Sequence, residues 1–286
     1  MTFDFKFMKY RKLVYAVSVL LILGAVASLV FKGLNYGIDF SGGIAIDAKP
    51  AAGYQLDKMR GDLAEWNPEL QADDKGNVLI RVGLDKNATE AEQNARVAEI
   101  KKALGDRVSY QQVQIVGPKI GGELIRGGIM AIVFAFLMMA VYVWIRYRGG
   151  YAVGSFLALS LDFFLMFGFY SIAGLEFSQT AIAVILTGIG YSINDKIVNY
   201  DRIEENAKKY KTMPTDQLID LSVNEMFVRT QITSVSTALG MMAMLIFAGG
   251  TLGDFALAML FSIFEGTLSS IFVSNALLMN FNIREK

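Results

Sequence analysis

One carboxylate stands where a plain membrane helix would carry leucine. Asp195 lies between Asn194 and Lys196, near the end of the apolar run Thr180–Val198, which is long enough to cross a bilayer as a helix. An ionisable side chain inside such a helix costs about 3 kcal/mol on insertion scales, so it usually faces a polar cavity or a partner charge. The alternative is that Asp195 reaches the membrane surface, roughly 7 Å away, but aspartate is short for that role. The chemistry open to this acid is reversible protonation.

Polar and small residues accompany Asp195 at helical spacing. A second such stripe lies in the fifth apolar run, where small residues also allow close helix packing. Consecutive helices cross in opposite directions, so Asp195 and Arg229 are expected toward the same side, with Arg229 paired to an acid on a neighbouring helix. The two stripes are Gly188, Ser192, Asp195 and Asn199, and Arg229, Thr233, Ser236, Thr237 and Gly240.

Two further acids fall inside apolar runs. Asp162 lies near the middle of the third run, where it must be protonated, paired or facing water, and Glu265 lies in the last run. Two neighbouring aspartates that share a proton would suit an intramembrane aspartyl protease. The Tyr-Asp and Gly-x-Gly-Asp signatures of that class are absent, which disfavours it.

Composition narrows the classes of function. Hydrophobic residues make up 53% of the 286 residues and gather in long blocks, which predicts an integral membrane protein. Lys and Arg (27) balance Asp and Glu (27), so no attraction to nucleic acid is implied. The absence of cysteine and histidine excludes disulfides, thiolate or imidazole metal sites and Ser-His-Asp catalysis. We expect no enzyme activity, cofactor or metal. No nucleotide motif is present, so work requires an ion gradient or a partner.

Six apolar runs predict six membrane-spanning helices. The first run is longer than the apolar core of a typical cleaved signal peptide, so we expect it to stay uncleaved as a spanning helix. Basic residues gather in alternate connections, including Lys6, Lys9, Arg146, Arg148, Arg284 and Lys286, which places both termini in the cytoplasm. The runs are Leu13–Phe31, Ile125–Ile145, Tyr151–Ile172, Thr180–Val198, Ile232–Phe247 and Phe255–Leu278.

The polar segment after the first run has the order β-α-β-β-α-β of a ferredoxin-like domain. Thr89 and Glu92 have the spacing of a capping box that opens its second helix. The fold class is therefore a membrane all-α bundle of six helices with an inserted α+β domain outside the cytoplasm, divided as 1–32, 33–124, 125–280 and 281–286. Its elements are expected at 43–48 (strand), 54–66 (helix), 69–72 and 78–83 (strands joined across the turn 73–77), 89–105 (helix) and 108–116 (strand).

Glycine-rich segments flank this domain on both sides, at 37–43 and 116–124. Neither has the spacing of a phosphate-binding loop, so we expect hinges between a rigid domain and the helices. The residues concerned are Gly37, Asp39, Gly42, Gly43, Gly117, Pro118 and Gly121.

These motifs resemble the SecF family, the smaller membrane subunits of bacterial SecDF complexes. The resemblance runs nearly end to end and rests most on Gly37–Gly43 and on Gly190–Asp195, with Val116–Leu124, Asp201–Ile203, Arg229–Thr230, Thr233–Ser234, Gly266–Thr267 and Ser269–Ser270 in support. It implies half of a resistance-nodulation-division architecture in the bacterial inner membrane, with a periplasmic domain. It also implies proton-driven promotion of protein export with a SecD-like subunit, the SecYEG channel and unfolded preprotein clients.

The resemblance further places Asp195 and Arg229 in a proton pathway, to which we add Asp162 and Asn194 as expected members. Two positions depart from the family pattern. Leu161 stands where the family commonly has histidine, and Lys196 stands where a small hydroxyl residue is usual, so that an ammonium group there can offset Asp195. A proton-coupled small-molecule exporter of the same superfamily and a passive scaffold are the alternative functions.

Overall fold

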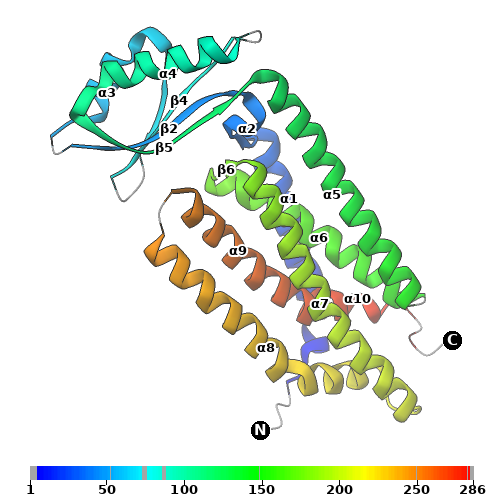
Figure 1. Cartoon of the computed structure of the whole chain (residues 1–286). Helices are drawn as coiled ribbons and strands as arrows, with labels where there is room; N and C mark the ends of the chain where they lie inside the picture. The colour runs from blue at the N-terminus through cyan, green and yellow to red at the C-terminus, as the bar shows by residue number, and fades with distance from the viewer. Residues whose placement is uncertain are drawn as a thin grey trace. The chain divides into compact units, whose positions relative to one another are not determined.

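The computed structural model describes residues 5–51, 53–72, 76–85, 88–147, 149–248, 250–281 and 283, excepting the side chains of 118–120. Two compact units make up the chain (Figure 1). The helical unit comprises Met1–Asn35, Ile132–Leu175 and Thr180–Lys286, and the sheet unit comprises Tyr36–Ala131 and Glu176–Gln179.

The helical unit carries the predicted membrane helices. Within the described ranges, six helices are long and apolar enough to span a membrane, which confirms the predicted number. Arg148, Arg284 and Lys286, used above for orientation, lie outside the described residues. The helices are α1(Arg11–Phe31), α5(Pro118–Arg146), α6(Gly150–Ala173), α7(Gln179–Lys209), α8(Thr215–Phe247) and α9(Gly250–Leu268), which continues through the π-helical turn η4(Ser269–Val273) into α10(Ser274–Leu278).

Two helices extend well beyond their apolar runs, which the sequence interpretation missed. α7 continues from Val198 to Lys209, and α8 begins at Thr215 rather than near Ile232. Polar side chains join these extensions: Arg202 pairs with Glu225 at 2.6 Å, and Asn206 donates to Ser222 Oγ at 2.9 Å. Apolarity marks only the part of a helix that suits lipid, whereas backbone hydrogen bonding and packing set its length.

Burial divides the six helices into two groups. In α6, α7 and the α9–α10 helix, 56%, 50% and 61% of the most apolar window is buried, whereas the value is 6% for α1, α5 and α8. α1 packs on α6, α8 packs on α9, and α6 also contacts α9 and α10. The outer helices therefore keep wide apolar faces uncovered, which suits lipid or a second membrane subunit.

The sheet unit is built on a four-stranded antiparallel sheet in the order β3-β4-β2-β5. Side chains from α3 and α4 complete one core with this sheet, in which Ile46, Met59, Ile80 and Ile100 are fully buried. The elements are β2(Gly43–Pro50), α3(Leu56–Asp62), β3(Glu69–Ala72), β4(Val78–Val82), α4(Glu90–Leu104) and β5(Val108–Val116).

Most of these bounds match the predicted elements. The expected helix 54–66 is shorter, since α3 ends at Asp62 and a 3-10 turn, η2(Ala64–Trp66), follows before Asn67 takes a left-handed conformation. β3 and β4 pair as predicted, although residues 73–75 of the expected turn lie outside the described residues.

The predicted capping box opens α4. Glu92 N donates to Thr89 Oγ1 at 3.4 Å, and Thr89 N donates to Glu92 Oε2 at 2.7 Å. These donors from Thr89 hold the pKa of Glu92 below its usual range. The stabilisation is therefore present above the ordinary glutamate pKa and is lost as pH falls through the lowered value.

Thr89→Ala is expected to cost about 1 kcal/mol, because it leaves an amide of the first turn without its acceptor. Faster hydrogen exchange in the first turn of α4, measured on the full chain at neutral pH, is the expected readout. Thr89→Ser keeps the acceptor and serves as the control. Unchanged exchange in Thr89→Ala would show that the box does not stabilise the helix.

The first glycine-rich segment is structured rather than an open loop. It forms β1(Asn35–Tyr36) and the short helix α2(Ile38–Ser41), and β1 pairs with β6(Glu176–Phe177). Asp39 Oδ2 accepts the amide of Gln179, the first residue of α7, at 2.9 Å. The ion pair from Arg81 to Glu176, at 2.6 Å, joins β4 to β6. The sequence patterns showed neither short strand.

At several of the predicted hinge glycines, neighbouring atoms leave no room for a Cβ atom. A Cβ at Gly43 would lie 2.7 Å from Val82 O, and one at Gly121 would lie 3.1 Å from Phe40 O. Gly42 and Gly43 have positive φ angles of 72° and 136°. Packing accounts for these glycines, and movement about them stays a prediction. Of the remaining positions, Gly37 adjoins the Glu176 side chain, Gly117 adjoins Gln93, and Pro118 begins α5.

Candidate functional site

The residues of the candidate site lie on two adjoining faces of α7, one buried and one partly exposed. Ser192, Lys196 and Asn199, at spacings of four and three residues, lie on the buried face. Asp195 is half-buried and lies beside this face, and Asn194 is exposed. The predicted stripe is thus corrected, because Lys196 rather than Asp195 continues the line of Ser192 inside the unit.

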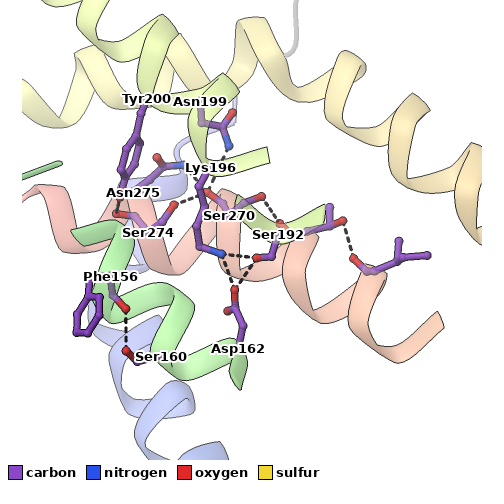
Figure 2. A network of polar contacts seen from close by, with 12 residues as sticks. Phe156, Ser160, Asp162, Ser192, Lys196, Asn199, Tyr200, Ser270, Ser274 and Asn275 are labelled. Carbon is purple, nitrogen blue, oxygen red and sulfur yellow. Dashed lines mark hydrogen bonds and ion pairs between the residues drawn. The ribbon is translucent and has the colours of Figure 1, made fainter. Parts of the chain in front are cut away.

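A buried ion pair joins α6 to α7. Lys196 Nζ donates to Asp162 Oδ2 at 2.7 Å, and the side chains are 0% and 3% exposed. Ser192 links the two groups, since its hydroxyl donates to the same carboxylate oxygen and accepts from Lys196 (Figure 2). Asp162 is therefore paired, and Lys196 is directed to it rather than to Asp195. A buried pair of this kind tolerates the loss of neither partner alone.

Buried amides and hydroxyls continue this network toward η4 (Figure 2). Asn199 donates to the Ser270 carbonyl at 3.3 Å, Asn275 donates to the same carbonyl at 2.9 Å, and Tyr200 donates to the Ser274 carbonyl at 3.0 Å. A π-helical turn frees carbonyl groups that an α-helix would engage, and such turns are frequent at functional sites. Here the side chains of α7 and α10 take up those carbonyls.

Asp195 opens onto a different environment. A cavity of about 360 Å³ lies between α7, α8 and α9, and Asp195 and Asn194 line it. Hydroxyl side chains dominate its polar wall: Ser192, Thr233, Ser234, Ser236, Thr237, Ser262 and Thr267. Three members of the predicted α8 stripe, Thr233, Ser236 and Thr237, therefore line this cavity, whereas Arg229 and Gly240 do not. Among the described pairs, only the Ser234–Thr267 contact, at 2.7 Å, joins α8 to α9 by hydroxyl groups.

Arg229 does not form the predicted ion pair in this structure. Its side chain is exposed, and no acid among the described residues lies within ion-pair distance of it. It lies one turn of α8 from Thr233, whose hydroxyl bonds to the Arg229 carbonyl. The structure thus brings Asp195 and Asn194 together at the cavity, places Asp162 in the buried pair, and leaves Arg229 apart from both. Side-chain partners across helices depend on helix rotation, which spacing along one helix does not report.

This arrangement suits proton exchange better than hydrolysis. A half-buried carboxylate with no hydrogen bond to a described residue can take up and release a proton through water in a hydroxyl-lined cavity. A protease would need both aspartates on one water, but Asp162 does not line the cavity of Asp195. Among the described residues, no group of three or more acids is placed to hold a metal ion.

Sequence reasoning missed the partner of Lys196 and the part played by Ser192. The available signal was the spacing of four residues between them on one helix, together with a lone acid, Asp162, on the preceding helix. Glu265 was noted without a partner, and it interacts electrostatically with both Asp162 and Lys196.

Comparisons with known proteins agree on one family. The family described as "Protein export membrane protein SecD/SecF, C-terminal" matches residues 96–284, and the "SecD/SecF GG Motif" matches residues 27–49. The protein translocase subunit SecF of Rickettsia felis is 37% identical over 290 residues, covering 99% of this chain and 93% of the relative. That of Rickettsia akari is 36% identical over 287 residues, with the same coverage.

Solved structures give the same match. The crystal structure of SecDF from Thermus thermophilus, titled a translocon-associated membrane protein, aligns with a TM-score of 0.86 at 34% identity over 97% of this chain. A SecDF structure titled as a super-membrane-facing form aligns with a TM-score of 0.72 over 98% of this chain. The present chain spans 38% and 39% of those two SecDF chains.

Proposed function

The chain belongs to the SecF family, and we propose that, as an accessory subunit of the Sec preprotein translocase, it uses the proton gradient to promote protein export. The observation that carries the proposal is Asp195, a half-buried carboxylate without an ion-pair partner among the described residues, on a hydroxyl-lined cavity inside the helical unit. A carboxylate in that position changes charge as it takes up a proton, and the change can bias two arrangements of the surrounding helices. The gradient, rather than a bound cofactor, supplies the energy.

We propose that a SecD-like subunit completes the helical unit. The chain spans little more than a third of SecDF, and α1, α5 and α8 keep apolar faces uncovered. Transporters built from repeats place their sites at the repeat interface, so a second half can supply part of the pathway. The SecYEG channel and unfolded preproteins are the further proposed partners, with lipid around the remaining faces.

The proposed location is the bacterial inner membrane, with both chain termini in the cytoplasm. Lys6 and Lys9 precede α1, Arg11 and Lys12 are its first two residues, and basic residues cluster again after Val198, which fits the positive-inside rule. The polar segment 33–124 then lies in the periplasm. The strand order β3-β4-β2-β5 with two intervening helices supports a ferredoxin-like domain there.

A gradient test separates this proposal from a passive scaffold. Vesicles holding SecYEG, the chain and its SecD-like partner are expected to export a preprotein faster than vesicles that lack the pair. A protonophore should remove that difference, whereas collapse of a sodium gradient should leave it. Stimulation that persists in the protonophore would support a scaffold. For the small-molecule exporter, drug sensitivity of a deletion strain without loss of export would be the supporting result.

A further inference from the structure

The buried pair of Asp162 and Lys196 has a third charged neighbour. Glu265 on α9 is half-buried, and its carboxyl interacts with both members of the pair. α6, α7 and α9 each contribute one ionisable group to this cluster. Two carboxylates beside one ammonium group would leave a net negative charge among buried apolar residues, and a carboxyl group there is protonated instead.

Nearby ionisable groups do not balance that charge. Tyr15 on α1 donates to the Ala276 carbonyl, and Tyr200 on α7 donates to the Ser274 carbonyl. Asp195 adds a further acid on the cavity side of α7 and supplies no positive charge. Arg229, the cation on α8, is exposed and pairs with none of the described acids. Lys196 is therefore the one cation that faces the two carboxyl groups among the described residues.

The hydrogen bonds of Asp162 also indicate that one of the two carboxyl groups carries a proton. Asp162 Oδ2 accepts from both Lys196 and Ser192, but the buried Oδ1 has no hydrogen-bond partner among the described residues. An ionised glutamate cannot donate to it, because a carboxylate only accepts. A protonated Glu265 has a donor to offer, and its carboxyl already lies beside Asp162. One proton on Glu265 would therefore neutralise the cluster and would also give Asp162 Oδ1 a hydrogen-bond donor.

We propose that Glu265 and Asp162 hold one exchangeable proton between them, and that this carboxyl pair is a second proton-binding site of the helical unit, distinct from Asp195. Its use in export rests on the proposed proton coupling, but the site itself does not. Release of the proton leaves two carboxylates and one ammonium, with net charge −1, and uptake restores a neutral cluster.

Ser192 connects this site to the cavity of Asp195. It lines that cavity and donates to Asp162. A proton can thus enter by one balanced exchange, in which the Ser192 hydroxyl gives its hydrogen to Asp162 and takes another from a hydronium ion in the cavity, which is left as neutral water. Gly188 and Gly266 let α7 and α9 approach closely near Ser192, since a Cβ at Gly266 would lie 3.0 Å from Ser192 Cβ and one at Gly188 would clash with Ser262.

Infrared spectroscopy of the full chain purified in lipid tests the proposal without any export reaction. At neutral pH the carboxylic-acid C=O band is expected to lose one component in Glu265→Gln, whose amide still donates to Asp162 and so preserves the fold. Lys196→Met is expected to gain a component, because the second carboxyl must then be neutralised as well. Glu65→Gln, at an exposed acid of the sheet unit, is the matched control and should leave the band unchanged.

Three results overturn the proposal. They are an unchanged band in Glu265→Gln, no gain in a folded Lys196→Met, and loss of the same component in Asp195→Asn but not in Glu265→Gln, which would assign the proton to Asp195. If Lys196→Met does not fold, Glu265→Gln and Asp195→Asn together still decide the matter. Gradient-independent export, which would overturn the proposed function, leaves these spectra unaffected.

Discussion

Asp195→Asn is expected to leave the chain in the membrane at its normal level and to abolish the part of export that depends on the proton gradient. Asparagine keeps the size and the hydrogen-bonding capacity of the side chain, but it cannot change charge. Asp195 makes no hydrogen bond to a described residue, so little structure depends on its ionised form. The expected loss therefore lies in activity rather than in folding.

Arg229→Leu is expected to behave similarly, for a reason that involves two arrangements of the helices. An arginine close to Asp195 favours the carboxylate, and its withdrawal favours the protonated acid. Each tenfold change in proton affinity corresponds to about 1.4 kcal/mol, so a modest displacement of α8 would couple protonation to movement. In the present structure Arg229 is exposed and forms no ion pair with Asp195, which is consistent with the second of these arrangements.

Export rate and membrane abundance, measured together, check both variants. Asp195→Glu keeps a titratable carboxyl group on a side chain one methylene longer, and it should retain part of the gradient-dependent export rate. Tyr191→Phe is the matched control, because Tyr191 lines the same cavity and the change removes a hydroxyl without altering any acid. A normally abundant and fully active Asp195→Asn would exclude Asp195 as the proton carrier, whereas a fall in abundance would assign it a structural role.

The second large effect is expected in the sheet unit. Gly43→Ala combines a positive φ of 136° with a Cβ placed 2.7 Å from Val82 O. Backbone strain at such a position costs about 1–3 kcal/mol, and the added clash with a backbone atom of β4 must also displace the β2–β4 pairing. Because a domain has only about 5–15 kcal/mol of stability, the loss is a large fraction of the total.

Hydrogen exchange on the full chain measures this loss, with faster exchange expected at the amides that pair β2 with β4, such as those around Ile46 and Ile80. Gly122→Ala is the matched control, because a Cβ there meets nothing within 4 Å and Gly122 lies in α5. That change is expected to be neutral or stabilising. Full protection in Gly43→Ala would show that packing does not require this glycine, and would favour the hinge interpretation.

Local patterns in the sequence determined much of the architecture. Six apolar runs were sufficient to predict six spanning helices, because the thickness of the bilayer sets a minimum length of apolar chain. The strands and α4 followed from alternation, helical spacing and the Thr89–Glu92 box, all of which act between residues close in sequence. Asp195 also stood out from sequence alone, since an acid in an apolar run is costly wherever the helix packs.

The partners of these residues were decided only by tertiary structure. Spacing along α7 placed Asp195 in the polar stripe, but helix rotation turned Lys196 inward to Asp162 and left Asp195 at the cavity. The expected ion pair of Arg229 is absent for the same reason. Close contacts at Gly43 and Gly121 also appear only in the folded chain, whereas hinge movement at the glycine-rich segments stays a prediction. A sequence reports which side chains share a face of one helix, whereas the rotation and crossing of packed helices, set by all their contacts together, select which faces meet.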